Sequence, residues 1–259
     1  MDADAEKIPH RGHELLSVLA RLGGSARNAQ IAQVMDVSEE TVRRLVKTLA
    51  KAGKVERVHG GTYLRGAQDA PIYSGALEQS PKEKASIARA LLDFIEDGMT
   101  LFINVGSTTT YVAEQLRDKK NLIVVTNSVT VVLALANHNG NRVFLAGGEI
   151  LRSERGAFGS ATEGFARKFS YDIAIFGADA ISADHGFLLL NPAEADLTRT
   201  VTEQAELSIV TADHRKFNER APMVACAPEQ IGRLITDARP DAKLCEALEK
   251  WRVELVVAD

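Results

Sequence analysis

The chain has 259 residues, of which 45% are apolar and 25% charged, as in ordinary soluble globular proteins with one large domain or two of usual size. Its longest apolar runs are far shorter than the roughly 20 residues of a membrane-spanning helix, and no signal peptide opens it. We therefore expect a cytoplasmic protein without a membrane partner. Cys226 and Cys245 are too few for a disulfide framework and lack metal-ligand spacing, which predicts free thiols and no bound metal.

The net charge of −4 is unevenly distributed along the chain. Residues 10–65 contain ten basic and five acidic residues, so this head carries +5 and the remaining residues carry −9. A basic head on an acidic body indicates two separate tasks, the first of which involves a polyanionic partner.

Three short helices are expected within the head. The first ends at Gly23-Gly24, and the second opens at Asn28 and stops in a tight turn at Asp36-Val37. Ser38 caps the third helix, which Gly53 closes. The residues expected to be buried, from the helical spacing of apolar side chains, are Leu15, Leu16, Val18, Leu19, Leu22, Ile31, Ala32, Val34, Met35, Val42, Leu45, Val46 and Leu49.

The outer face of the third helix is basic. Arg43, Lys47 and Lys51 follow one another at four-residue spacing and therefore form a stripe on one side of the helix. Arg44 and Thr48 lie beside this stripe. A face of this kind favours contact with a polyanion.

A short hairpin is expected after the third helix. Val55 to Val58 and Thr62 to Leu64 flank the glycine turn His59-Gly60-Gly61. Three helices and a two-stranded wing make a winged helix-turn-helix, whose third helix enters the major groove of DNA while the wing lies along the backbone. A three-helix protein-interaction domain with a solvated basic face is the alternative. We favour DNA because the positive charge, the short second helix and the wing occur together.

Residues 31–44 (Ile-Ala-Gln-Val-Met-Asp-Val-Ser-Glu-Glu-Thr-Val-Arg-Arg) and 57–61 (Arg-Val-His-Gly-Gly) resemble the DNA-binding domain of DeoR-family bacterial transcription regulators. One departure is Leu45, where the family usually has Asp, and Leu45 can simply extend the apolar face. By this resemblance the wing from His59 to Thr62 touches the DNA backbone. The DNA-contacting residues that the resemblance implies are Ser38, Thr41, Arg43, Arg44, Lys47, Arg57, His59, Gly60 and Gly61.

A linker is expected between the head and the body. Residues 66–79 contain Pro71, two glycines and no clean periodicity, so the predicted domains are residues 1–65 and 80–259. Ser80-Pro81-Lys82-Glu83 has the pattern of a capping box with proline at the first helical position. It begins a helix that is expected to run to about Glu96.

Short apolar runs alternate with helical stretches along the body. The strands expected from these runs are 101–105, 122–125, 143–146, 173–177, 207–211, 223–226, 234–235 and 255–257. Helices that reach Leu116 and Ala136 follow the first two. Such runs, bounded by glycines and helices, predict an α/β fold with a largely parallel sheet covered on both faces. Ligands of such sheets bind at the carboxyl ends of the strands.

Polar segments follow five of these runs. They are residues 106–110, 126–128, 147–148, 177–179 and 213–216. All can face one crevice that suits a phosphorylated sugar or polyol, with hydroxyls and amides for the phosphate, Asn127 and Asp179 for hydroxyl groups, and Lys216 for charge. Each segment also has a purely structural interpretation, as a helix cap, a turn or, for Lys216, a solvated lysine.

Further motifs extend the DeoR resemblance over nearly the whole chain. They are Asp97-Gly98, Gly159, the segment 172–182, Asp184-His185-Gly186, Glu194-Ala195, and Asp213 with Lys216-Phe217. The resemblance implies a sugar-phosphate-sensing domain related in fold to ribose-phosphate isomerases. The effector-binding residues that it implies are Gly106, Ser107, Thr108, Thr109, Thr110, Thr126, Asn127, Ser128, Gly147, Gly148, Asp179, Glu194 and Lys216. The chain departs from the family at two places in the body. The family often has a lysine a few residues after the Glu-Ala pair, where Arg199 stands nearest, and many members have two serines in place of His214-Arg215.

We therefore expect a transcription repressor that binds operator DNA as a homodimer or homotetramer, takes no cofactor and leaves DNA when a phosphorylated sugar or polyol binds. An activator with the same parts is one alternative. A sugar-phosphate isomerase with a DNA-binding head is the other, since Asp179, Asp184 or Glu194 can offer the carboxylate base. A complete winged head would be superfluous to a metabolic enzyme, so we expect a regulator and no enzyme.

Overall fold

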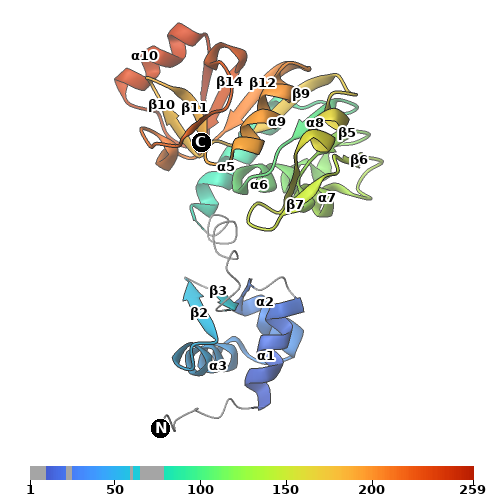
Figure 1. Cartoon of the computed structure of the whole chain (residues 1–259), viewed down its shortest axis with the longest axis vertical. Coiled ribbons are helices and arrows are strands. Elements are labelled where there is room, and N and C mark those ends of the chain that lie inside the picture. Colours follow the sequence, from blue (N-terminus) through green and yellow to red (C-terminus); the bar gives the residue numbers. More distant parts are fainter. Residues whose placement is uncertain (1–9, 22–24, 59–60, 65–78) are drawn as a thin grey trace. The chain divides into compact units, whose positions relative to one another are not determined.

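The computed structural model describes residues 10–21, 25–58, 61–64 and 79–259 (Figure 1). The chain divides into two compact units, Met1–Gln79 and Ser80–Asp259. Three expectations lie outside the described residues: the end of the first helix at 22–24, the tip of the wing at His59-Gly60, and the linker as far as residue 78.

The first unit combines helices with a small antiparallel sheet. Its elements are α1 (His10–Arg21), β1 (Ser25–Arg27), α2 (Asn28–Met35), α3 (Glu39–Lys51), β2 (Val55–Val58) and β3 (Gly61–Leu64). β2 and β3 form the expected antiparallel hairpin, which pairs Val58 with Gly61. β1 lies on the other side of β3 and pairs Ser25 with Tyr63. Its three residues carry too little alternation to predict a strand from sequence.

The core of the first unit is the apolar face that its three helices share. Its buried residues are Leu15, Val18, Leu19, Ile31, Ala32, Met35, Val42, Leu45, Val46, Leu49 and Val55. Leu45 is buried and extends the apolar face of α3, as expected. The expectation for Val34 is wrong, because its side chain is 49% exposed. Val34 lies about 100° around α2 from the middle of the buried side, so it faces solvent.

The second unit is built on a parallel seven-stranded sheet. Its strands, in spatial order, are β15 (Glu254–Val257), β14 (Arg233–Thr236), β12 (Ala205–Thr211), β9 (Tyr171–Phe176), β4 (Thr100–Ile103), β5 (Ile123–Thr126) and β6 (Arg142–Leu145). Each neighbouring pair runs parallel, which confirms the predicted type of sheet. The carboxyl ends of all seven strands therefore lie at the same edge.

Helices cover both faces of this sheet (Figure 1). They are α5 (Pro81–Leu91), α6 (Ser107–Gln115), α7 (Val129–Leu135), α8 (Ser160–Ala166), α9 (Pro192–Thr202) and α10 (Ala242–Trp251). The helices α5, α6 and α7 bury apolar side chains in one cluster with Leu101 and Ile103 of β4. The helices α8, α9 and α10 share a second cluster with Phe102 of the same strand. Successive side chains of a strand point to opposite faces, so the two clusters lie on opposite sides of the sheet.

Smaller elements surround the main sheet. They are η1 (Leu92–Phe94), η2 (Leu116–Asp118), β7 (Glu149–Leu151), β8 (Gly156–Phe158), β10 (Ala180–Ser182), β11 (Gly186–Leu189), η3 (His214–Lys216), β13 (Met223–Val224) and η4 (Pro228–Gln230). The run 223–226, expected in the parallel sheet, instead supplies β13, which pairs antiparallel with β11. This correction has a simple reason: apolar spacing identifies a strand but not its neighbour.

The start and the end of α5 also differ from expectation. Ser80 has a left-handed backbone conformation, with φ of 50°, and its side chain caps no amide of the described helix, so the expected capping box does not form. The helix ends at Leu91 and continues as η1 instead of reaching Glu96. Ile95 is buried nonetheless. The sequence pattern therefore overestimated the length of the helix.

Candidate nucleic-acid interface and candidate anion site

The first turn of α3 is held by two hydroxyl groups. The Oγ of Ser38 accepts a hydrogen bond from the Thr41 backbone amide at 3.2 Å, and it lies 2.9 Å from the Thr41 Oγ1. Glu39 and Glu40 occupy the same turn, where the helix dipole favours negative charge. The predicted cap at Ser38 is therefore confirmed, and both hydroxyls already have a structural task.

The basic stripe of α3 is exposed along its length. Arg43, Arg44, Lys47 and Lys51 all lie on the solvent side of the helix. The Arg43 guanidinium pairs with Glu39 at 3.4 Å and with Glu40 at 3.3 Å. Exposed ion pairs of this kind contribute less than about 1 kcal/mol, so a DNA phosphate can displace them.

One residue of the wing differs from expectation. Thr62 is buried, and its hydroxyl donates to the Asn28 Oδ1 at 3.0 Å. It therefore ties the wing to the first residue of α2, and contact between this side chain and a DNA backbone is excluded in this arrangement. Among the other expected wing contacts, His59 and Gly60 lie outside the described residues, and Gly61 begins β3.

The five polar segments of the body lie side by side. They follow β12, β9, β4, β5 and β6, which are consecutive neighbours in the parallel sheet. Because parallel strands end at one edge, the tertiary structure brings all five segments to that edge. The expected gathering of these segments is thus a property of the fold.

The hydroxyl groups in the segment after β4 fall into two groups: those that form internal hydrogen bonds and those that form none. The Thr109 Oγ1 donates to the Asn104 carbonyl at 2.8 Å, and the Thr110 Oγ1 donates to the Gly106 carbonyl at 2.8 Å. These bonds shape the loop in which Gly106, with φ of 148°, caps α6. Within the described part of the chain, the hydroxyls of Ser107 and Thr108 make no hydrogen bond. They stand on the first turn of α6, where backbone amides also lack helical partners.

Asn104 and Glu194 form a buried polar pair at the same edge. The Asn104 Oδ1 accepts from the Val105 amide at 2.9 Å, and its Nδ2 donates to the Glu194 Oε1 at 3.1 Å. Asn104 is completely buried and Glu194 is only 7% exposed. Asn104 was not among the expected site residues, although a polar residue directly after an apolar run is a usable signal.

Three carboxyl groups influence one another here. Burial raises the pKa of Glu194 well above its ordinary value, and the charges of Asp179 and Glu154 raise it further. Burial and the Asp179 charge also raise the pKa of Glu154, a residue that the sequence did not single out. Asp179 accepts a hydrogen bond from the Leu190 amide at 2.8 Å and lies 4.0 Å from the Lys216 ammonium. A protonated carboxyl group can both donate to and accept from the hydroxyls of a polyol.

Positive charge gathers around the segment after β12. The Asp213 carboxylate is buried and accepts two hydrogen bonds from the Arg215 guanidinium, at 2.8 and 2.9 Å. Lys84 of α5 is 1% exposed, and burial lowers its pKa to about 8 although the nearby Asp213 charge opposes this shift. The charges of Arg215 and Lys216 lower it further. Three cations therefore lie at this edge.

Lys84 is another residue at this edge that sequence reasoning missed. A lysine on an amphipathic helix is ordinarily counted as solvated. Its spacing carried the signal, because Lys84 precedes Ile87, Ala88 and Leu91 by three, four and seven residues and so belongs to the buried face.

The segment after β5 is fully engaged in internal hydrogen bonds. The Thr126 Oγ1 donates to the Ile103 carbonyl at 2.5 Å, and the Ser128 Oγ caps α7 through the Val131 amide. The Asn127 Oδ1 accepts from the Val105 amide at 3.2 Å while its Nδ2 donates to the Ala157 carbonyl at 3.1 Å. All three expected effector residues are buried. Their geometry suits residues that position the loop after β4.

Gly147 and Gly148 follow β6 and are exposed. The Gly147 carbonyl accepts a hydrogen bond from the Thr162 hydroxyl at 2.9 Å. A Cβ atom on Gly148 would lie 2.3 Å from the Thr162 Oγ1 and 2.6 Å from the Phe158 carbonyl oxygen. Gly148 is therefore required for close approach of the backbone to α8.

The two departures from the family pattern also have partners. The Arg199 guanidinium donates to the Val224 carbonyl at 2.7 Å and pairs with Asp196. It therefore ties α9 to β13. The His214 Nδ1 lies 2.6 Å from the Asp237 carboxylate, and Arg215 holds Asp213 as described above.

The described ranges contain neither a candidate metal site nor a candidate membrane-spanning helix. No group of three or more His, Cys, Asp or Glu side chains there could hold a metal ion. No helix of those ranges combines the length and the apolarity needed to cross a membrane. Both cysteines in them are free, with Cys226 buried and Cys245 partly so.

Comparison with known families and proteins matches both units. A DeoR-like helix-turn-helix domain matches residues 11–65, and a DeoR C-terminal sensor domain matches residues 79–238. The transcriptional repressor AccR of Agrobacterium fabrum is 31% identical over 89% of this chain and 90% of its own length. The repressor CsqR of Escherichia coli is 29% identical over 95% of this chain and 94% of its own length. The glycerol-3-phosphate regulon repressor of Escherichia coli is 29% identical over 94% and 96%.

Likenesses to solved structures are more distant. A D-ribose-5-phosphate isomerase in complex with phospho-erythronic acid is 21% identical over 53% of this chain and 54% of its own, with a TM-score of 0.40. The eIF2B delta chain of Chaetomium thermophilum is 14% identical over 86% of this chain and 78% of its own, with a TM-score of 0.42.

Proposed function

Because the chain belongs to the DeoR family of transcription regulators, we propose that it represses a sugar or polyol operon and leaves its operator when a phosphorylated effector binds. Several relatives carry names of this kind, among them the glycerol-3-phosphate regulon repressor and a putative aga operon repressor. In this proposal residues 1–65 bind DNA, residues 66–79 link the domains, and residues 80–259 sense the effector and assemble a cytoplasmic homodimer or homotetramer.

The proposed DNA contact runs along the outer face of α3. Arg43, Arg44 and Lys47 are exposed there and reach bases or phosphates of a major groove. The N-terminal cap at Ser38 and Thr41 fixes the start of the helix, so the basic stripe is presented by a rigid element. Arg57 and the wing from His59 to Gly61 supply the backbone contacts.

The proposed effector lies across the carboxyl edge of the sheet. Its phosphate binds the hydroxyls of Ser107 and Thr108 and the first amides of α6. β4 and β12 flank β9, so the segments after them are about 10 Å apart, and the cations around Asp213 can reach the same anion. Asp179 and Glu194 bind hydroxyl groups of the sugar or polyol. Gly147 and Gly148 border the same edge, while residues 126–128 hold the loop in place.

One observation carries this proposal. The hydroxyls of Ser107 and Thr108 on α6 lack internal partners, and the neighbouring helix α5 carries a buried lysine whose pKa is lowered to about 8. A bound anion stabilises the charged form of a buried lysine, because the attraction between the two charges offsets the free-energy cost of removing the ammonium from water.

Release of DNA requires a difference in effector affinity between two states. The effector must bind the arrangement that cannot bind DNA more tightly than the arrangement that can. A coupling free energy of about 1–3 kcal/mol is typical and changes operator affinity roughly 5- to 150-fold.

A thermal-shift screen of phosphorylated sugars and polyols tests the proposal. A compound that binds the native state raises the melting temperature by mass action. The best compound is then added to a complex of the protein with operator DNA, and we expect release of the DNA. If no phosphorylated compound raises the melting temperature, the proposed effector site is wrong. A ligand that stabilises the protein and strengthens DNA binding would indicate a co-repressor or an activator.

A catalytic alternative follows from the raised pKa of Glu194. A buried carboxyl group of this kind can serve as a base in aldose–ketose isomerisation. We propose binding without turnover, since the relatives with full-length similarity are named as repressors. Incubation of the purified protein with ribose 5-phosphate or an amino-sugar phosphate decides this point, and product formation would favour the enzyme.

A further inference from the structure

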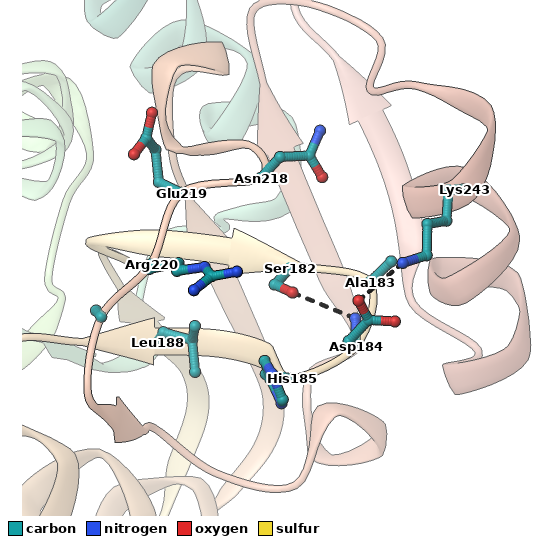
Figure 2. Close-up of a pocket in the computed structure, with 10 residues that line it drawn as sticks. Ser182, Ala183, Asp184, His185, Leu188, Asn218, Glu219, Arg220 and Lys243 are labelled. Atoms are coloured by element: carbon teal, nitrogen blue, oxygen red, sulfur yellow. Dashed lines mark hydrogen bonds and ion pairs between the residues drawn. The ribbon is translucent and has the colours of Figure 1, made fainter.

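One pocket of the second unit is lined by none of the residues of the proposed effector site. It has a volume of about 410 Å³ and opens between the β10–β11 hairpin, the segment after η3 and the first turn of α10 (Figure 2). The lining residues that matter below are Ser182, Asp184, His185, Leu188, Arg220 and Lys243. Its volume lies within the range of roughly 300–1,000 Å³ that is usual for small-molecule sites.

The acidic wall of this pocket is already neutralised. The Asp184 carboxylate accepts a hydrogen bond from the Lys243 ammonium at 2.7 Å, and this contact lowers the pKa of Asp184. Figure 2 shows the pair at one side of the pocket, while the side chain of Glu219 leads away from Arg220 and Ser182. Neither carboxylate therefore compensates a charge at the centre of the pocket.

The opposite wall presents an arginine without a partner. Among the residues that the structure describes, the Arg220 guanidinium makes no hydrogen bond and no ion pair. Figure 2 shows its side chain extending toward Ser182. The Ser182 Oγ accepts from the Asp184 amide at 3.2 Å, which leaves its own hydrogen available for donation. The exposed ring of His185 adds a further donor at the rim.

We propose that this pocket binds a small organic anion, whose carboxylate or phosphate group pairs with Arg220 and Ser182 and whose body rests against Leu188 and His185. A planar guanidinium matches either group with two parallel hydrogen bonds. Leu188 lies beneath the pocket and is only 4% exposed, so it contributes a small apolar contact to the carbon skeleton. The arrangement combines directed polar groups with the small apolar side chains of Ala183 and Ala221.

The pocket shares two chain segments with the proposed effector site but none of its residues. β10 begins directly after Asp179, and residues 218–220 follow Lys216. The Asn218 amide donates to the Ile181 carbonyl at 2.8 Å, so the two segments are joined by a backbone hydrogen bond. A ligand here would be a second ligand, and substitutions can separate it from the effector.

The imidazole resonances of His185 provide a local test in the full-length protein. We would titrate citrate and inorganic phosphate separately, at constant pH and ionic strength, with sodium chloride as the blank, and assign the resonances with His185→Gln. We expect a saturable shift with at least one anion. Arg220→Gln should weaken that binding roughly tenfold. Arg117→Gln changes an exposed arginine of η2 and should not weaken it.

The outcomes separate the two sites. A response to citrate alone identifies a carboxylate ligand, and a response to phosphate alone identifies a phosphate ligand. Thr108→Val should leave the His185 response unchanged, because its hydroxyl belongs to the other site. The proposal is overturned if neither anion shifts His185 saturably, or if Arg220→Gln binds as tightly as the unmodified protein.

Discussion

The side-chain amide of Asn104 donates a hydrogen bond to the Glu194 carboxylate across 3.1 Å, and this bond joins the end of β4 to the first turn of α9. Asn104 and Glu194 are 90 residues apart in the sequence and are both buried. The pair therefore sets the position of a carboxyl group whose pKa is raised by burial and by two neighbouring acids. Loop geometry and site electrostatics are coupled through this one bond.

Glu194→Gln should stabilise the protein at neutral and alkaline pH. The raised pKa means that the folded state favours protonated Glu194. The stability that the protonated carboxyl group contributes is therefore complete below its ordinary pKa of 4.5, and it is lost as the pH rises through the pKa of the folded state. Glutamine never ionises and escapes this loss. Thermal unfolding between pH 4 and pH 9 should show a higher melting temperature for Glu194→Gln than for the unmodified protein, and this difference should disappear at the acidic end. Glu206→Gln, at an exposed position of β12, is the control and should show no such trend.

Lys84→Met should stabilise the protein and weaken its response to the effector. The lowered pKa means that the charged form destabilises the fold below about pH 8, and that this cost vanishes above the ordinary value of 10.5. Removing the charge should add up to about 3 kcal/mol to the free energy of unfolding at pH 7.

Chemical denaturation at pH 7 and pH 10.5 checks the size of this gain, which should shrink at the higher pH. Lys82→Met on the exposed side of α5 is the matched control. If effector binding survived Lys84→Met unchanged, the buried lysine would have no part in the effector site.

Thr108→Val and Thr109→Val should have different effects. Thr108 has a hydroxyl available to a ligand, so its loss should weaken effector binding roughly tenfold while operator binding and stability are kept. Ser107→Ala should act in the same way. Thr109 is buried and donates to Asn104, so Thr109→Val should cost about 1–3 kcal/mol of stability. Calorimetric titration and thermal unfolding of the variants would show this division, and equal behaviour of both threonines would contradict it.

Arg43→Ala should weaken operator binding. The loss is expected to be about 1–3 kcal/mol if the guanidinium contacts a base, and close to that of a surface change if it does not. A fluorescence-anisotropy titration of labelled operator at fixed salt measures it. Arg11→Ala, on the exposed side of α1, is the matched control. Unchanged affinity for Arg43→Ala would remove this residue from the DNA contact.

Local patterns predicted the first unit well because caps and apolar spacing act over a few residues. Asn28 opens α2, Ser38 caps α3, and Leu45 is buried as its spacing required. Val34 was predicted incorrectly because a helix as short as α2 buries only a narrow side. The capping box at Ser80 was predicted incorrectly for a different reason: a sequence pattern does not reveal that the residue adopts a left-handed conformation.

The location of the candidate site could also be predicted, because parallel strands necessarily end at one edge. The use of each side chain at that edge could not. Thr126, Asn127 and Ser128 have the same chemistry as Ser107 and Thr108, yet the structure engages the first three in internal hydrogen bonds. Partners such as Ala157 are distant in the sequence, so no local pattern distinguishes the two groups.

The sequence alone determined the family, the parallel sheet and the order of the polar segments, because these depend on motifs and periodicities that act over short distances. Only the tertiary structure decided which groups are buried and with what charges beside them. Desolvation and hydrogen bonding depend on neighbours from remote parts of the chain, as at Lys84 beside Asp213 and at Asn104 beside Glu194. For that reason the hydroxyls of Ser107 and Thr108, and not those of Thr126 and Ser128, are proposed to hold the phosphate of the effector.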